Sequence, residues 1–221
     1  MKKLMVSLFA ILAMFAVSAC DTSSSKKTND PPSGTYEGTW DWSTFDDQKN
    51  PKDGTSAADI KAGNYTPVGK SEISMVKATE DGKSVYIAEG QLKTGFEYPF
   101  AGLIAIPDDA ETVSNLKKAV GISFMAAADK TMDIDVKFPQ DDIKGPLEGG
   151  DGDSAFYYKK IHLTTAEKEF TINISDIAQP SDWGAKKPFK QNLVDQINWQ
   201  TTQSAGFQFE FRIWDLKLLM P

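Results

Sequence analysis

The sequence has one cysteine, Cys20, and one histidine, His162, among 221 residues. Because a disulfide joins two thiols, the chain forms no internal disulfide. A lone histidine also excludes a metal centre built from several histidines. A single histidine on a strand is usually structural, so His162 alone does not indicate catalysis.

Clusters of lysine and arginine are missing, and the formal net charge is −7. Removing an N-terminal segment that contains Lys2 and Lys3 takes this charge to −9. Phosphate binding depends on clustered basic side chains, so we expect no nucleic-acid partner.

Long apolar runs are missing too, apart from the stretch from Leu4 to Val17. That run follows two lysines and is shorter than the roughly 20 apolar residues of a transmembrane helix. Small residues end it. The pattern predicts a signal peptide over residues 1–19, which is removed from the mature protein.

The residues from Val17 to Cys20 resemble the bacterial lipobox, in which the signal is cut before a cysteine that carries lipid. The resemblance implies acylation of Cys20 and a membrane-anchored lipoprotein of the bacterial cell envelope, facing the periplasm or the cell exterior. Ordinary secretion is the alternative, and it leaves an odd thiol unexplained. Residues 20–34 are polar and rich in serine and proline, which predicts a flexible tether.

Residues 35–221 suit one domain with a full-sized core. Alternation of apolar and polar residues is cleanest in TMDIDVKF (131–138) and recurs in EFTINIS (169–175) and FQFEFRI (207–213). In the last strand the apolar positions change phase at Trp214, which predicts a β-bulge. Short helices are expected only at 108–119 and 55–62. The sequence therefore predicts an all-β fold, a two-sheet antiparallel β-sandwich of the jelly-roll type with one or two short helices.

Three segments resemble the jelly-roll carbohydrate-binding modules of bacterial glycan-degrading systems, which share the galactose-binding-like fold. They are AVGISFMAAADKTMDIDVKFP, FYYKKIHLTTAEKEFTINISDIAQPSDWG and VDQINWQTTQSAGFQFEFRIWDLKLL. Their order and spacing carry the resemblance. The chain departs from the family at Glu167, where a tryptophan is usual. It departs again at Trp214, where an acid is usual unless the alignment shifts by one residue to Asp215.

The resemblance implies a ligand cleft on the concave face of one sheet. The alternation puts these side chains on the non-core side of that sheet: Met125, Asp133, Asp135, Lys137, Tyr158, Lys160, His162, Asn198 and Gln200. Amides, carboxylates and cations near aromatic faces suit a hydroxyl-rich ligand. An ordinary solvated sheet face has the same composition, so both interpretations stay open.

The tryptophans divide into two groups. Trp40, Trp42 and Trp199 lie in phase with apolar strand positions, which predicts that they are core residues. Trp183 lies among turn-forming residues in AQPSDWGAKKPF. It either folds back over the edge of the core or stacks on a ligand, and its place in a Gln-Pro-x-x-Trp-Gly loop favours the first role.

Modules of this fold often hold a structural calcium near the chain ends, and calcium takes about six to eight oxygen ligands. Asp46, Asp47 and Asp215 are the candidate ligands here. The alternative is that the first two are solvated loop carboxylates and the third is a bulge residue.

Glycosidases use two carboxyl groups, and Asp133 and Asp135 share one strand face. Alternating acids on a solvated strand are far commoner, so we predict no catalytic residue. We expect a lipid-anchored, non-catalytic protein that binds a glycan or polysaccharide at the bacterial cell envelope. The alternative is a structural or assembly lipoprotein that holds an envelope protein partner through the same sandwich.

Overall fold

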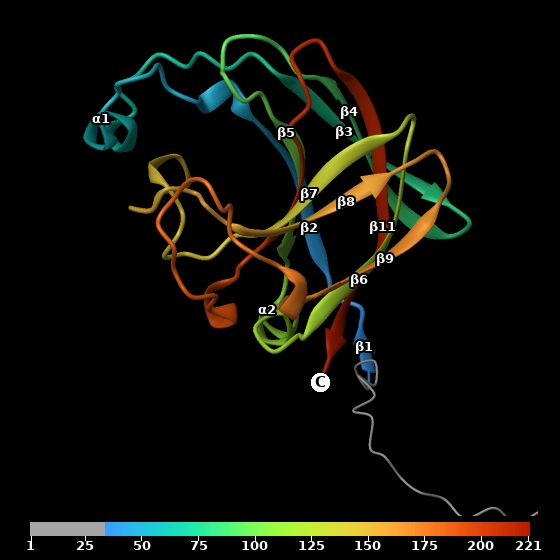
Figure 1. Cartoon of the computed structure of the whole chain (residues 1–221). Helices are drawn as coiled ribbons and strands as arrows, with labels where there is room; N and C mark the ends of the chain where they lie inside the picture. The colour runs from blue at the N-terminus through green and yellow to red at the C-terminus, as the bar shows by residue number, and fades with distance from the viewer. Residues whose placement is uncertain (1–33) are drawn as a thin grey trace, which may run out of the picture. The chain divides into compact units, whose positions relative to one another are not determined.

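The computed structural model describes residues 34–221, so the predicted signal peptide, Cys20 and all but the last residue of the predicted tether lie outside the described residues. Two antiparallel β-sheets pack face to face, with short helices and long connections around them (Figure 1). Residues 34–221 belong to one compact unit. The predicted all-β sandwich is confirmed.

The first sheet has six strands within the described residues, in the order β3-β4-β11-β6-β9, with β1 beside β11. Its strands are β1 (Gly34–Tyr36), β3 (Glu72–Glu80), β4 (Lys83–Gln91), β6 (Gly121–Ala128), β9 (Lys168–Asn173) and β11 (Gln208–Met220). Each neighbouring pair is antiparallel.

The second sheet has five strands in the order β2-β5-β10-β7-β8, so β2 and β8 form its two edges. Its strands are β2 (Trp40–Asp46), β5 (Ala101–Pro107), β7 (Met132–Phe138), β8 (Tyr157–Leu163) and β10 (Ile197–Thr201). Buried and partly exposed residues alternate along the whole of β7, as the period-two pattern predicts.

The helices are short and lie in the connections, as the sequence predicts. They are α1 (Ala57–Ala62), α2 (Ala110–Leu116) and the 3₁₀ turns η1 (Asp47–Lys49), η2 (Pro146–Glu148), η3 (Ile174–Asp176) and η4 (Gln191–Leu193). Side chains cap both α-helices, because Ser56 accepts from the Asp59 N–H and Asp109 from the Thr112 N–H. In the described part of the chain, no helix is long and apolar enough to cross a membrane.

The core lies between the sheets and confirms the prediction for three tryptophans. Trp199 is fully buried, Trp42 stacks on it with ring centroids 5.3 Å apart, and Trp40 packs against the same cluster. Phe124 meets the Trp199 ring edge-on at 5.4 Å. These rings tie the second sheet to the first.

The predicted bulge is present in β11. Trp214 pairs with Met125, but Lys217 pairs with Ser123, so the register shifts between Trp214 and Lys217. Asp215 has a left-handed φ of 52° at this point.

One sequence prediction about this region is wrong, because Met125 lies in β6 of the first sheet and packs beside Trp214. The chain crosses to the other sheet between β6 and β7. Met125 therefore shares no face with Asp133.

Candidate functional site

The outer face of the second sheet carries polar side chains that are buried. Ile197 and Trp199 point into the core, so Asn198 and Gln200 point the other way. Yet Asn198 is only 5% exposed and Gln200 only 8%. Something other than the core must cover them, so this face forms the floor of a recess.

Strand register brings most of the sequence-predicted site residues together on this floor. One row across β10, β7 and β8 is Asn198, Lys137 and Tyr158, and the next row is Gln200, Asp135 and Lys160. The Lys137 Nζ donates to Gln200 Oε1 at 2.9 Å. Six of the predicted residues thus form one polar surface.

Asp133 and His162 lie one row further along and are more exposed than Asn198, Gln200 and Asp135. His162 Nδ1 lies 2.9 Å from Asp133 Oδ1. The structure places this pair on the same face, at its solvated end.

Lys137 is the most unusual group on the floor. Burial lowers its pKa to about 8, although the negative charges of Asp135 and Glu148 act in the opposite direction. Asp135 is mostly buried, and its Oδ1 lies 3.5 Å from the Lys160 Nζ. The floor therefore offers two buried amides beside a half-buried cation and a largely buried carboxylate.

Gln196 Nε2 donates to Asn198 Oδ1 at 3.0 Å, and two long connections lie on this side of the sheet (Figure 1). The β2–β3 connection (47–71) leaves one edge of the sheet where Asp46 pairs with Ala101. The β7–β8 connection (139–156) leaves β7, the strand next to the opposite edge strand β8, at the other end of the sheet, beyond the pairing of Lys137 with Asn198. Although they start from diagonal corners, they meet, because α1 packs against η2 and Lys61 forms an ion pair with Asp151.

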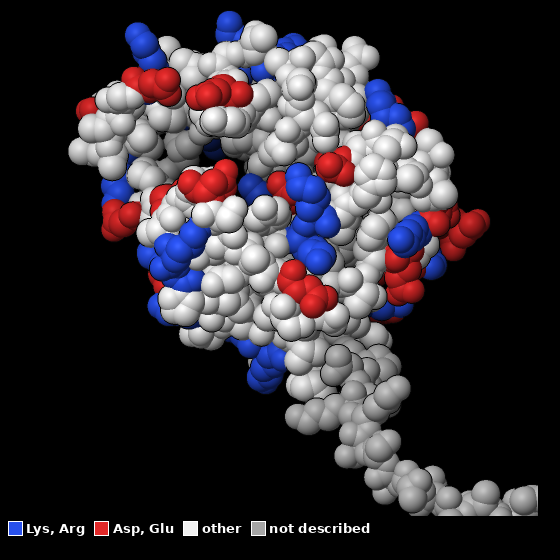
Figure 2. All heavy atoms as spheres, viewed as in Figure 1, with Lys and Arg blue, Asp and Glu red and all other residues white. Residues whose placement is uncertain are grey.

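We call these two connections together the arch. Figure 1 shows α1 and the β7–β8 connection on the same side of the second sheet, away from the first sheet. Figure 2 shows the molecule hollowed in this region, with basic side chains visible at the back of the hollow. Glu148 at the end of η2 lies close enough for its charge to act on Lys137. The recess thus has the sheet as its floor and the arch on the opposite side.

Aromatic rings line one end of the recess. Phe45 lies over Gly102 on the outer face, where a Cβ on Gly102 would collide with the Phe45 ring and the Trp199 carbonyl. From Phe45 the rings of Phe100, Phe96 and Tyr98 follow at centroid distances of 6.0, 6.1 and 6.5 Å. Tyr98, at the outer end, is 68% exposed.

The sequence prediction missed this aromatic series. The segment TGFEYPF (94–100) could have indicated the series, because it places three aromatic residues in a connection that is rich in turn-forming residues. A loop with so many rings has more apolar surface than its own turn needs.

Trp183 lies in a loop that is fastened to the β7–β8 connection. Gln179 Nε2 donates to the Ala155 carbonyl at 2.8 Å, Gln179 Oε1 accepts from the Lys187 N–H at 2.9 Å, and the Ala185 N–H donates to Asp153. Burial raises the Asp153 pKa, but the hydrogen bonds from Ala185 and Ala155 outweigh it, and the net pKa is lowered.

The interpretation of Trp183 as a cap on the core is wrong. Its side chain is 48% exposed and lies outside the core cluster. The hydrogen bond to Glu97 is the main cause of a raised Tyr98 pKa, and the charge of Asp182 contributes as well. The Trp183 loop therefore lies within electrostatic range of Tyr98, which is also exposed.

The three candidate calcium ligands do not come together. Asp46 accepts from the Gln48 N–H at 2.9 Å, and burial is the main cause of its raised pKa. Asp47 is fully buried and accepts from the Ser71 N–H at 2.9 Å and the Ser71 hydroxyl at 2.7 Å. Asp215 lies in the first sheet, away from Asp46 and Asp47, and forms an ion pair with Lys83 of the same sheet.

Within residues 34–221, no three histidine, cysteine, aspartate or glutamate side chains gather in a way that would hold a metal ion. The expectation that Asp46, Asp47 and Asp215 share a calcium ion is therefore not met. Their oxygens are used in a turn, a buried hydrogen-bond network and an ion pair with lysine.

Replacing Asp47 with alanine is expected to destabilise the domain by about 2 to 4 kcal/mol, because the Ser71 and Phe100 donors would be left buried without their acceptor. Urea unfolding of both chains, with calcium and with a chelator, measures this loss. A loss below about 0.5 kcal/mol, or one seen only with calcium, would contradict the structural role.

Comparison with known proteins shows the fold. No family model matches the sequence, and no curated protein matches it either. Among solved structures, the chain is similar to a family 11 carbohydrate-binding module from Clostridium thermocellum in complex with a β-1,3-1,4-mixed-linked tetrasaccharide. The TM-score is 0.54 at 15% identity, covering 86% of this chain and 95% of that one.

A second structure, the family 11 module of a cellulosomal cellulase of Clostridium thermocellum, gives a TM-score of 0.53 at 13% identity. That match covers 84% of this chain and 91% of the module. The jelly-roll fold expected from the sequence is thereby confirmed.

Proposed function

We propose that this protein binds a carbohydrate in the recess on the outer face of the second sheet, without catalysis, as a lipid-anchored protein of the bacterial cell envelope. The observation that carries the proposal is the buried polar floor. Asn198 and Gln200 are buried and Lys137 is half-buried, yet all three lie outside the core. Burying polar groups lowers the stability of a fold, and such groups are found more often at binding sites than elsewhere.

The chemistry of the recess suits sugars. Amide, ammonium and carboxylate groups on the floor supply donors and acceptors for hydroxyl groups, and the rings of Phe45, Tyr98 and Trp183 offer faces for the C–H side of a pyranose. The solved modules named above have the same fold, and one of them was solved with a bound tetrasaccharide.

An enzyme is not supported by the two acids on β7. Asp133 and Asp135 are two residues apart on one face of one strand, whereas a glycosidase holds its carboxyl groups on either side of the scissile bond. Asp133 is bound to His162, and Asp135 lies near Lys160. Both acids therefore belong to the polar surface and not to an acid–base pair.

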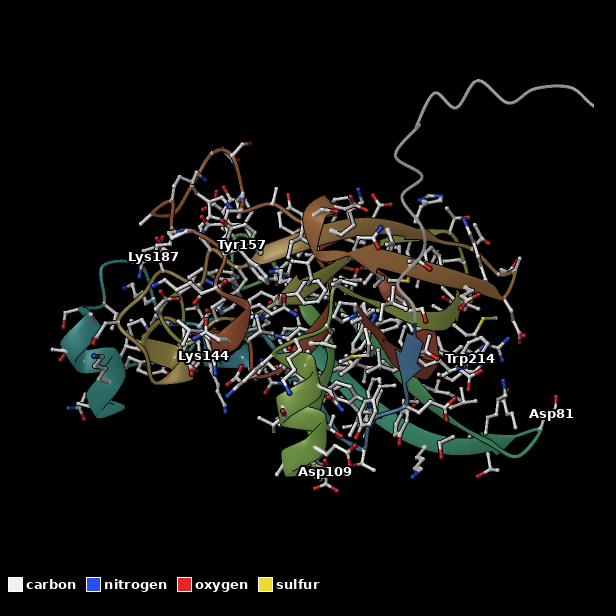
Figure 3. The ribbon with its side chains drawn as sticks, turned by 90° about the horizontal axis from the view of Figure 1, so that it is seen from below. Asp81, Asp109, Lys144, Tyr157, Lys187 and Trp214 are labelled. Carbon is white, nitrogen blue, oxygen red and sulfur yellow. The ribbon has the colours of Figure 1, made fainter. Side chains whose placement is uncertain are left out.

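The alternative function, binding of a protein partner, draws on the outer face of the first sheet. There Val85, Ala127 and Trp214 form a small second apolar cluster. Figure 3 shows Trp214 on the side of the molecule opposite Lys144 and Tyr157. Arg212 lies over the Trp214 ring at 5.6 Å and pairs with Glu167 at 2.8 Å, so this cluster is largely covered.

A glycan array probed with the purified chain tests the proposal, followed by affinity electrophoresis against each polysaccharide that gives a signal. A chain with Lys137→Met serves as the site-deficient variant. Absence of binding to plant, microbial and host glycans, or equal binding by the Lys137→Met chain, would overturn the proposed function or its site.

Replacing Trp183 with alanine is expected to lower glycan affinity roughly fivefold to tenfold while leaving the unfolding midpoint almost unchanged, since its ring is exposed and outside the core. Trp183→Phe keeps an aromatic face and is the matched control. Isothermal calorimetry and thermal unfolding measure both effects. A marked loss of stability with full affinity would instead support a structural role.

A further inference from the structure

The arch over the floor has one half that is attached mainly at its base. In the β2–β3 connection, Pro51 and Pro67 form a β-bridge and the Val68 N–H donates to the Asn50 carbonyl at 2.8 Å. Beyond this base, the described segment includes α1, in which no residue is buried. The helix begins with a Ser56 cap and ends at Gly63 in the left-handed region. It is therefore a preformed element held outside the core.

The other half of the arch is anchored more firmly. In the β7–β8 connection, Gln140 and Ile143 are fully buried. Lys144 pairs with Asp195 and Asp141; burial lowers its pKa, but these carboxylates outweigh that effect and the net pKa is raised. Between these buried residues and β8 comes η2, in which no residue is buried. One side of the arch is thus held by buried residues, and the other is attached mainly at its base.

The contact that joins the two halves lies in solvent. Lys61 of the β2–β3 connection pairs with Asp151 of the β7–β8 connection, and their side chains are 44% and 89% exposed. An exposed ion pair contributes little to stability and is weakened by salt. The ion pair that joins the two halves of the arch is therefore a weak contact between segments from opposite sides of the sheet.

We propose that the arch is a gate, and that the ligand of the recess is a single glycan chain admitted sideways when α1 separates from η2. This rests on the proposed function. With the arch closed, the floor lies under the two connections, so a polymer segment without a nearby end enters only when they part. A flat or bundled polysaccharide surface does not reach the floor at all. The bound chain is enclosed and leaves slowly.

The first test needs no glycan. The Lys137 amine is labelled with a short pulse of acetic anhydride at pH 8, and the extent of its acetylation is measured by mass spectrometry of peptides. Lys61→Glu places two negative charges where the two halves of the arch meet, because the new glutamate faces Asp151. Asp151→Lys places two positive charges there, because the new lysine faces Lys61. Each is expected to raise Lys137 acetylation roughly fivefold, and the double exchange Lys61→Glu/Asp151→Lys is expected to restore the native rate.

Lys52→Glu is the matched control, because it makes the same charge change in the same connection at an exposed residue outside α1. It is expected to leave Lys137 acetylation unchanged. Equal acetylation in all five chains would overturn the gate.

The second test closes the gate permanently. A chain with Lys61→Cys and Asp151→Cys, and with Cys20→Ser to leave two thiols, is bridged with a bismaleimide. A long soluble polysaccharide that gave a signal on the array is then added. Its rate of association with the bridged chain is expected to be at least about tenfold lower than with the same chain before bridging. Bridged and unbridged chains with the same association rate would overturn sideways entry and leave the binding function intact. If no glycan binds any of these chains, the proposed function fails, and the acetylation rates still decide whether the arch controls access to the floor.

Discussion

Replacing Lys137 with methionine is expected to abolish glycan binding and at the same time to stabilise the domain. Burial lowers the Lys137 pKa from 10.5 to about 8, so the folded state disfavours its positive charge. That difference corresponds to at most about 3 kcal/mol of stability lost at neutral pH, since one pKa unit is about 1.4 kcal/mol. Methionine keeps the unbranched side chain and removes this cost, but it offers no donor to a sugar hydroxyl.

The lowered pKa of Lys137 also decides whether the stability of the domain rises or falls with pH. Between about pH 8 and pH 10.5 the unfolded chain still carries the Lys137 proton and the folded chain has lost it. Because stability rises with pH wherever the unfolded state binds more protons, Lys137 contributes a rise in the free energy of unfolding across this window. Below pH 8 both states are protonated and its full cost applies. The methionine variant is expected to lack this rise.

Glycan affinity is expected to change in the opposite direction. As pH rises through 8, the floor loses an ammonium donor, and hydrogen bonds from charged donors are the stronger kind. Urea unfolding and calorimetric titration at pH 7, 8 and 9 measure the two trends. Lys159→Met is the control, because Lys159 is exposed and its register partner Val136 points into the core. Unchanged binding by the Lys137→Met chain would remove Lys137 from the site.

The floor of the site was predictable from sequence because it lies on regular strands. Period-two alternation in β7 separates Asp133, Asp135 and Lys137 from the core residues between them, and the same rule places Asn198 and Gln200 on either side of Trp199. No comparable rule assigns strands to sheets. Met125 does point away from the core, as the alternation predicts, but its strand belongs to the first sheet.

The arch was not predictable, because it depends on where two long connections meet. Nothing in the local sequence of Lys61 or Asp151 indicates a partner 90 residues away. The predicted set of calcium ligands failed for a similar reason. Asp46 and Asp47 were expected to meet Asp215, but hydrogen bonds and an ion pair engage all three where they stand.

Trp199→Ala is expected to cost about 3 to 5 kcal/mol, a large share of the about 5 to 15 kcal/mol by which a domain is stable. Trp199 is fully buried and contacts Trp42 and Phe124, which come from the two different sheets. Its removal leaves a cavity at the point where the sheets are joined. Because Asn198 and Gln200 flank it on the same strand, glycan binding is expected to fall with the loss of folded protein.

A second substitution separates packing from hydrogen bonding at this position. The indole Nε1 of Trp199 is buried and has no hydrogen-bond partner among the described residues. Trp199→Phe therefore removes an unsatisfied donor together with part of the ring, and its expected cost is only about 1 to 2 kcal/mol. Urea unfolding of the three chains measures both values, and affinity electrophoresis at low temperature follows binding. Equal losses for alanine and phenylalanine would show that the indole nitrogen matters more than the packed ring. That result would require a partner for the nitrogen within the fold.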